Sequence, residues 1–128
     1  MPSEFIAPEY AGWWRITETG AWVNDGLDDL GPAVISFTGH ADRLRMHCLL
    51  AYVSARFTRG GISFTWTGAW EYDQKSGTGR ARLGKDGRLT GTIKIKGGDE
   101  STFIAERTEE PVEPIPEPPS YRDKWRRR

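Results

Sequence analysis

Between residues 12 and 107, apolar and polar side chains alternate in short runs with a period of two. Ile62, Phe64 and Trp66, for example, alternate with serine and threonine. The other apolar positions with this period are Trp14, Ile16, Ile35, Phe37, Leu44, Met46, Val53, Ala55, Phe57, Ala81, Leu83, Ile93, Ile95, Phe103 and Ala105. A period of two places the apolar side chains of a run on one face, so each run predicts a half-buried β-strand.

Glycine and polar residues separate these runs and predict the turns. Arg59-Gly60-Gly61 and Lys85-Asp86-Gly87 are typical of hairpin turns, and residues 74–77 and 97–99 predict further turns. Connections this short make neighbouring strands antiparallel. We therefore predict an all-β fold over residues 10–107, an antiparallel up-and-down meander barrel of seven or eight strands. Closing such a sheet removes its unpaired edges.

The composition changes after Arg107. Residues 108–119 contain five of the eight prolines and four glutamates, which predicts an extended, polyproline-like linker. The last eleven residues carry five basic side chains and one acidic side chain. We therefore expect a disordered Pro-rich tail, residues 108–128, that ends in a basic and aromatic peptide. Such a peptide either orders on binding a partner or remains a solubilising terminus. Its candidate partner contacts are Tyr121, Arg122, Lys124, Trp125 and Arg126.

The charges of the chain balance, with 18 basic and 18 acidic residues. Residues 1–107 also balance, with 13 of each kind. This gives no overall electrostatic attraction to nucleic acid or to an anionic membrane, so we expect nucleic acid contacts only through the basic tail. No run approaches the roughly 18 apolar residues of a membrane-spanning helix. The start of the chain lacks a basic and then apolar leader, so a cytoplasmic location is expected.

The first strand begins with Gly12-Trp13-Trp14 and a meander follows it. This opening resembles lipocalins and the avidin-like barrels that are grouped with them as calycins. The resemblance implies that Trp14 plugs one end of the barrel and that Arg107 packs across it. The order Gly-x-Trp-Arg-Ile, acidic loop, Leu-Gly-Pro-Ala, Phe-x-Trp-x-Gly, Asp-Gly-x-Leu-x-Gly is similar to a group of small uncharacterised bacterial proteins. The disulfide and the three spaced motifs of typical lipocalins are absent, so ligand carriage does not follow from the resemblance.

Large aromatic side chains share the inward parity of the strands. Small barrels have room either for packed side chains or for one small ligand, so these side chains are core residues or the walls of a ligand site. They are Trp14, Phe37, Phe57, Phe64 and Trp66. Trp13 and Trp70 do not fit this stripe. Exposed tryptophan often anchors contacts between proteins, which makes these two side chains candidates for partner binding.

Two groups of residues are candidates for other chemistry. Asp25, Asp28 and Asp29 lie in the longest break, residues 24–32, which has room for a short helical turn; the three carboxylates either bind calcium or stay solvated. Glu71 and Asp73 are two residues apart and share a face, as an acid and base pair of a glycosidase would, but they also suit an exposed turn.

The single cysteine and the two histidines give no metal-ligand spacing. Cys48 lies in an apolar-rich stretch, where a buried and inert thiol is expected, and it excludes an internal disulfide. His47 shares its parity with Arg43 and Arg45, so we expect it to face outward, and His40 has no partner at ligand spacing. We therefore expect no metal, no cofactor and no catalytic residues.

These patterns favour a non-enzymatic binding module that engages a protein partner through the rim loops of the barrel and the C-terminal tail. Two weak contacts joined by a linker gain from effective concentration. A carrier of a small apolar ligand is the alternative hypothesis. A hydrolase that uses Glu71 and Asp73 is a third.

Overall fold

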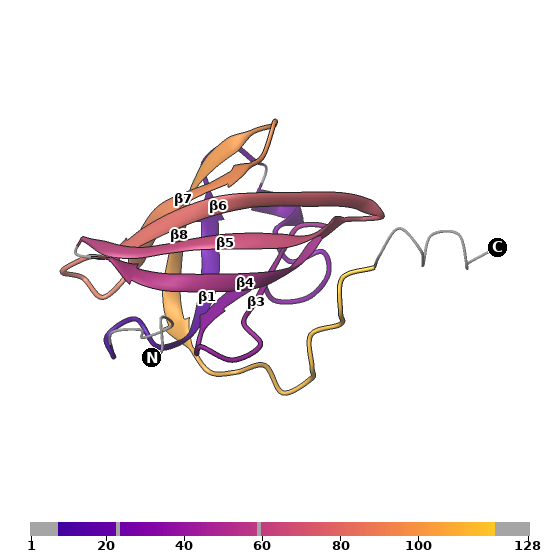
Figure 1. The fold of residues 1–128 in the computed structure, drawn as a ribbon. Helices are drawn as coiled ribbons and strands as arrows, with labels where there is room; N and C mark the ends of the chain where they lie inside the picture. The colour runs from indigo at the N-terminus through magenta and orange to yellow at the C-terminus, as the bar shows by residue number, and fades with distance from the viewer. Residues whose placement is uncertain (1–7, 23, 59, 120–128) are drawn as a thin grey trace.

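The computed structural model describes residues 8–22, 24–58 and 60–119. Eight strands follow in chain order and close into an antiparallel barrel (Figure 1), which confirms the predicted fold class. Each strand pairs with the next, and β8 returns to pair with β1. The strands are β1 (Gly12–Thr19), β2 (Val34–Phe37), β3 (Arg43–Met46), β4 (Leu49–Thr58), β5 (Gly61–Trp70), β6 (Asp73–Leu83), β7 (Leu89–Ile95) and β8 (Glu100–Thr108).

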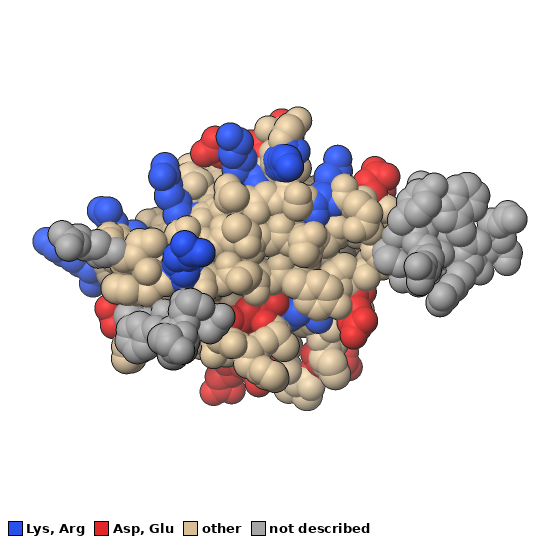
Figure 2. Space-filling model, in the orientation of Figure 1, with Lys and Arg blue, Asp and Glu red and all other residues tan. Residues whose placement is uncertain are grey.

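The predicted alternation sets the two sides of the barrel wall. In β5, Phe64 and Trp66 are buried while Thr65 and Thr67 are exposed. The outward sides of the other long strands are mostly polar, with Leu50 and Ile104 as exceptions. Figure 2 shows basic side chains along the upper part of the molecule, over β6 and β7. A strand with one apolar and one polar face is stable only where the apolar face is covered. Closure of the sheet provides that cover.

The long connection between β1 and β2 packs on the outside of β3. It contains a short 3-10 helix, Asn24–Gly26, which confirms the expected helical turn. The backbone N–H of His47 donates to the carbonyl of Leu27 at 2.8 Å, and Nε of Arg45 donates to the carbonyl of Pro32 at 3.0 Å. Within the described residues, no helix is long and apolar enough to cross a membrane.

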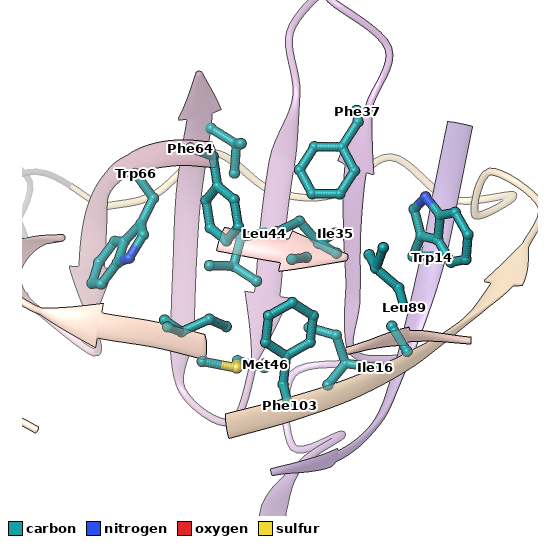
Figure 3. Packing of buried hydrophobic residues seen from close by; sticks show 14 of the residues in the cluster. Trp14, Ile16, Ile35, Phe37, Leu44, Met46, Phe64, Trp66, Leu89 and Phe103 are labelled. Carbon is teal, nitrogen blue, oxygen red and sulfur yellow. The ribbon is translucent and has the colours of Figure 1, made fainter. Parts of the chain in front are cut away.

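Side chains fill the interior of the barrel, as Figure 3 shows. Trp14, Ile16, Ile35 and Phe37 are fully buried, and the rings of Phe37 and Phe64 have centroids 5.7 Å apart. Protein interiors pack as densely as organic crystals, so rings of this size need small neighbours. Glycines on the neighbouring strand β6 supply that space.

The predicted turn at residues 74–77 is wrong, because these residues lie inside β6. A Cβ at Gly77 would clash with the backbone carbonyl of Lys94 and would stand 2.8 Å from Cζ2 of Trp66, and a Cβ at Gly79 would clash with Cζ of Phe64. These glycines therefore make room for rings, rather than for a bend in the chain. The turn between β5 and β6 instead falls at residues 71–72. The turns at residues 85–87 and 97–99 are confirmed, with positive φ at Gly87 and Gly97.

The Gly79→Ala substitution should lower the free energy of unfolding by about 1–3 kcal/mol, because the added methyl group overpacks the ring of Phe64. In the background of Phe64→Leu the same substitution should cost less, since the ring is gone. Urea unfolding of the four variants measures this coupling. Gly98→Ala is the control, because its added Cβ would meet no atom closer than 3.4 Å. Equal costs in both backgrounds would contradict the proposed contact.

Candidate functional site

Trp14 and Arg107 close one end of the barrel, named here the plugged end. The indole of Trp14 is fully buried, and its Nε1 donates to the carbonyl of Tyr10 at 3.1 Å. The guanidinium carbon of Arg107 lies 4.4 Å from the centre of the Trp14 ring. The guanidinium also donates to the carbonyls of Ala11 and Glu9, each at 2.7 Å. This contact has the form that the sequence resemblance implies, and it fixes the incoming N-terminal segment.

Four of the five predicted interior aromatic residues meet inside the barrel, and Phe57 does not. Its position on β4 lies beyond the plugged end, where its ring is 38% exposed and packs 6.2 Å from the ring of Tyr10. Alternation predicts which face a side chain takes, but not where the barrel ends. Inside, Trp66 is 2% exposed and its Nε1 finds no hydrogen-bond acceptor among the described residues.

Trp22, His47 and Trp70 cover the opposite end, named here the aromatic end. The rings of His47 and Trp70 are stacked with their centroids 5.9 Å apart, and the ring centroid of Trp22 lies 6.0 Å from each of these centroids. The two indoles are half-buried, whereas His47 is 7% exposed. The expectation that His47 faces solvent is therefore wrong. The residue sits in the turn between β3 and β4 with φ of 53°, and the loop that carries Leu27 covers it.

The environment of His47 disfavours its charged form. Burial lowers the pKa of the imidazole, while the carboxylates of Asp29 and Asp28 and a hydrogen bond with the backbone of Gly26 act in the opposite direction. Nε2 is buried and has no hydrogen-bond partner among the described residues. A neutral imidazole that stacks on the indole of Trp70 and meets that of Trp22 edge-on is the arrangement favoured at this end.

The acidic loop between β1 and β2 acts as a structural tie. Asp28 accepts hydrogen bonds from the guanidinium of Arg15 at 2.5 Å and from the backbone N–H of Ala33 at 2.9 Å. Asp25 and Asp29 are exposed. Among the described residues, no group of three or more histidine, cysteine or acidic side chains is placed to hold a metal ion.

Glu71 lies on the turn between β5 and β6, Asp73 is the first residue of β6, and both are exposed. Glu71 has φ of 59°, and its backbone N–H donates to the carbonyl of Cys48 at 3.0 Å. Cys48 is half-buried, not fully buried as expected. Burial raises the pKa of its thiol, and Glu71 and Asp29 raise it further, so the unreactive protonated form prevails at neutral pH. The two carboxylates thus lie on an open rim rather than in a deep cleft.

The described part of the Pro-rich segment, residues 109–119, lies against the barrel wall and is named here the strap. It has no regular secondary structure. Arg43 on β3 fastens it: one guanidinium nitrogen donates to the carbonyl of Ile115 at 3.1 Å, and another donates to the carbonyl of Pro116. The side chain of Ile115 is 9% exposed, whereas that of Val112 is 99% exposed. The strap is therefore anchored at one apolar residue.

The strap joins the two ends of the barrel (Figure 1). It leaves β8 after Thr108, at the plugged end, and the amide of Gln74 on β6 donates to the carbonyl of Pro119 at 3.1 Å, at the aromatic end. Trp13 pairs with Ser36 and Thr108, so it lies at the plugged end and does not share a surface with Trp70. The other predicted partner contacts, Tyr121, Arg122, Lys124, Trp125 and Arg126, lie outside the described residues.

Sequence reasoning missed the contact of Arg43 with Ile115. Ile115 and Val112 are the two large apolar side chains in a stretch otherwise made of proline and glutamate, which was the available signal. Residues 72 positions apart meet here, so spacing along the chain could not identify the partner.

Comparisons with known proteins do not assign the chain to a family. No family model matches it, and no curated protein or solved structure gives a match. The assignment of a role therefore depends on the residues themselves.

The substitution Ile115→Ala should release the strap. Removing most of a buried isoleucine side chain costs about 1–2 kcal/mol at such a site, which raises the open fraction about 5- to 30-fold. Limited proteolysis with proteinase K, with fragments mapped by mass spectrometry, should then show faster cleavage within residues 109–119. The exposed neighbour provides the matched control, Val112→Ala, which should leave the cleavage rate unchanged. Equal cleavage of both variants would show that Ile115 does not hold the strap.

The stability of the protein should fall as the pH drops through about 6.5, the pKa of an unfolded histidine. Because burial lowers the pKa of His47, the unfolded chain binds the proton more readily, and the free energy of unfolding rises with pH in this window. Thermal unfolding between about pH 5.5 and about pH 7.5 should show a smaller slope for His47→Gln. His40→Gln, at an exposed histidine, should keep the slope of the unmodified protein. An unchanged slope in the His47 variant would contradict this assignment.

Proposed function

We propose that this protein is a non-catalytic binding module of the calycin type that engages a protein partner at the aromatic end of its barrel, in a cytoplasmic setting. The observation that carries the proposal is the course of the strap. Pro119 is held by Gln74 at the end where Trp22 and Trp70 lie half-buried. Residues 120–128, with their basic and aromatic side chains, continue from this point.

The chemistry of the aromatic end supports docking to another protein. Tryptophan side chains that are partly exposed and packed on one another are frequent energetic centres of protein interfaces. The rings at this end lose little conformational freedom on binding, since Trp70 already stacks on His47. A terminal peptide tethered beside such a surface raises the effective concentration of the second contact, so that each contact can be weak.

The same geometry argues against an interior ligand as the main function. Trp14, Phe37 and Phe64 occupy the interior with their own rings. The carrier of a small apolar ligand remains the second candidate because of one observation, the buried Nε1 of Trp66 that lacks an acceptor. Buried indole N–H groups usually find a hydrogen-bond partner. Native mass spectrometry of protein purified from its source distinguishes these functions, since a carrier would retain a bound molecule.

The proposal predicts that partner capture depends on the order of residues in the terminal peptide. The immobilised full chain should retain a partner that a chain ending at Pro119 loses by about tenfold or more, as expected when one of two linked contacts is removed. The matched control keeps the composition of residues 120–128 and scrambles their order, which preserves the charge. Quantitative mass spectrometry of the retained proteins is the measurement. Equal retention by all three chains would refute the role of the tail.

A substitution at the aromatic end tests the other contact. Trp70→Phe keeps an aromatic ring against His47 but removes part of the surface, so capture should weaken severalfold. Trp13→Phe, at the plugged end, is the control and should leave capture unchanged. If Trp13→Phe weakened capture and Trp70→Phe did not, the partner would bind at the plugged end.

A further inference from the structure

Outward side chains on β4–β7 form a wall of hydroxyl and cationic groups, named here the basic face. One row of this face crosses four strands at the same level. Its register pairs are Arg56 with Ser63, Ser63 with Arg80, and Arg80 with Thr92. Adjacent strands are about 4.8 Å apart, so such a row presents closely spaced donors along a line across the sheet.

A second row runs beside the first. It joins Ser54 to Thr65, Thr65 to Thr78, and Thr78 to Lys94. All four side chains are exposed. The first row alternates cationic and hydroxyl side chains, the second carries three hydroxyl side chains and one lysine, and neither row contains a carboxylate.

The basic face is hollowed. A basin of about 940 Å³ opens over β5–β7, with Arg80, Arg82 and Lys94 among the residues that line it. Glu100 is the one carboxylate among the described residues of its lining. A second hollow of about 540 Å³ adjoins it, since Thr78 and Lys94 line both, and Tyr52 forms its far side.

The cations of this face have one acidic neighbour among the described residues of the basin, Glu100, which is the cross-strand partner of Lys94. None of Arg56, Arg80 and Lys94 takes part in an ion pair with a carboxylate of the described residues, whose ion pairs involve Arg15 and Arg88. Two of the four glutamates of the strap act elsewhere, because Glu113 lies near Arg45 and Glu117 near Arg43. Figure 2 shows the result, with basic side chains along the upper part of the molecule and most acidic ones below. The balanced net charge of the chain therefore conceals a local excess of positive charge.

We propose that the basic face binds single-stranded nucleic acid, with the phosphodiester backbone lying in the basin. Arginine, lysine, serine and threonine are the side chains that most often contact phosphate oxygens, and these four make up the two rows. Proteins that bind single strands combine such a cationic groove with an aromatic side chain on which a base stacks.

Tyr52 supplies the aromatic platform and favours nucleic acid over an acidic protein. Its ring is 42% exposed, and the guanidinium of Arg43 lies 4.9 Å from the ring centre. The arginine supports one side of the ring, while the exposed part borders the second hollow. An acidic peptide would gain from the cations alone, whereas a base would also gain from the ring. The surface is distinct from the aromatic end, so this inference goes beyond the proposed function.

The test measures binding of a fluorescein-labelled oligothymidine by anisotropy. The protein is the full chain in which Arg122, Lys124, Arg126, Arg127 and Arg128 are replaced by glutamine, so that the tail does not contribute charge. The substitutions Arg80→Gln and Lys94→Gln together should weaken binding by about tenfold or more. They should also reduce the slope of log K against log salt concentration by about 1.4, which corresponds to two phosphate contacts. Tyr52→Leu should weaken binding by about tenfold without changing that slope.

The matched control is the pair Lys85→Gln and Arg88→Gln, which removes the same charge at the turn between β6 and β7 and beside it. Arg88 is already paired with Glu106 at 3.5 Å. This pair should leave binding within about twofold of the background protein. Equal losses in the control and in the basic-face variants, or equally tight binding of poly-glutamate in competition, would overturn the proposal. Trp70→Phe should leave oligonucleotide binding unchanged, which separates this inference from the proposed function.

Discussion

The interior of this barrel is full, and the rest of the structure depends on how its rings are accommodated. A closed sheet of eight strands encloses a volume that side chains can just fill. Phe64 and Trp66 project from β5 into this space and lie over Gly79 and Gly77 of β6. Because the two strands pair residue by residue, each ring has a glycine as its direct neighbour. The pairing of large with small residues across β5 and β6 thus fixes both the packing and the strand register.

Because side chains occupy the interior, the groups that are available for binding lie at the ends of the barrel and on its outer wall. At the plugged end, the guanidinium of Arg107 donates hydrogen bonds to the backbone of the N-terminal segment and makes a cation–π contact with the ring of Trp14. At the aromatic end, Trp22 and Trp70 are half-buried, whereas the loop that carries Leu27 covers His47. The polar groups at the plugged end are therefore already hydrogen-bonded, whereas the aromatic end has apolar surface that is partly exposed to solvent.

The fold could be predicted from the sequence because a period of two places residues directly on one side of a strand. The period of two could not predict the environment of a residue where that environment depends on another part of the fold. His47 has the parity of an outward residue, but a loop covers it. Gly77 lies in a stretch whose composition is typical of a turn, but in the structure its lack of a side chain leaves space for the ring of Trp66 on the neighbouring strand. Phe57 has the inward parity, but β4 extends past the end of the barrel. Each difference arises from the three-dimensional arrangement of the strands and loops, which alternation along one strand does not contain.

Charge shows the same dependence on three-dimensional arrangement. The sequence has equal numbers of acidic and basic residues, which gives no overall field that would attract a polyanion. The strap alters this balance locally, because it carries Glu113 and Glu117 to the wall of β3, near Arg45 and Arg43. Among the described residues, Arg56, Arg80 and Lys94 form no ion pair, and Glu100 on β8 is the cross-strand partner of Lys94. Exposed charges separated by more than about 8–10 Å are largely screened at physiological salt. A ligand at the basic face therefore interacts with the local cations, and the zero net charge of the whole chain has little effect on it.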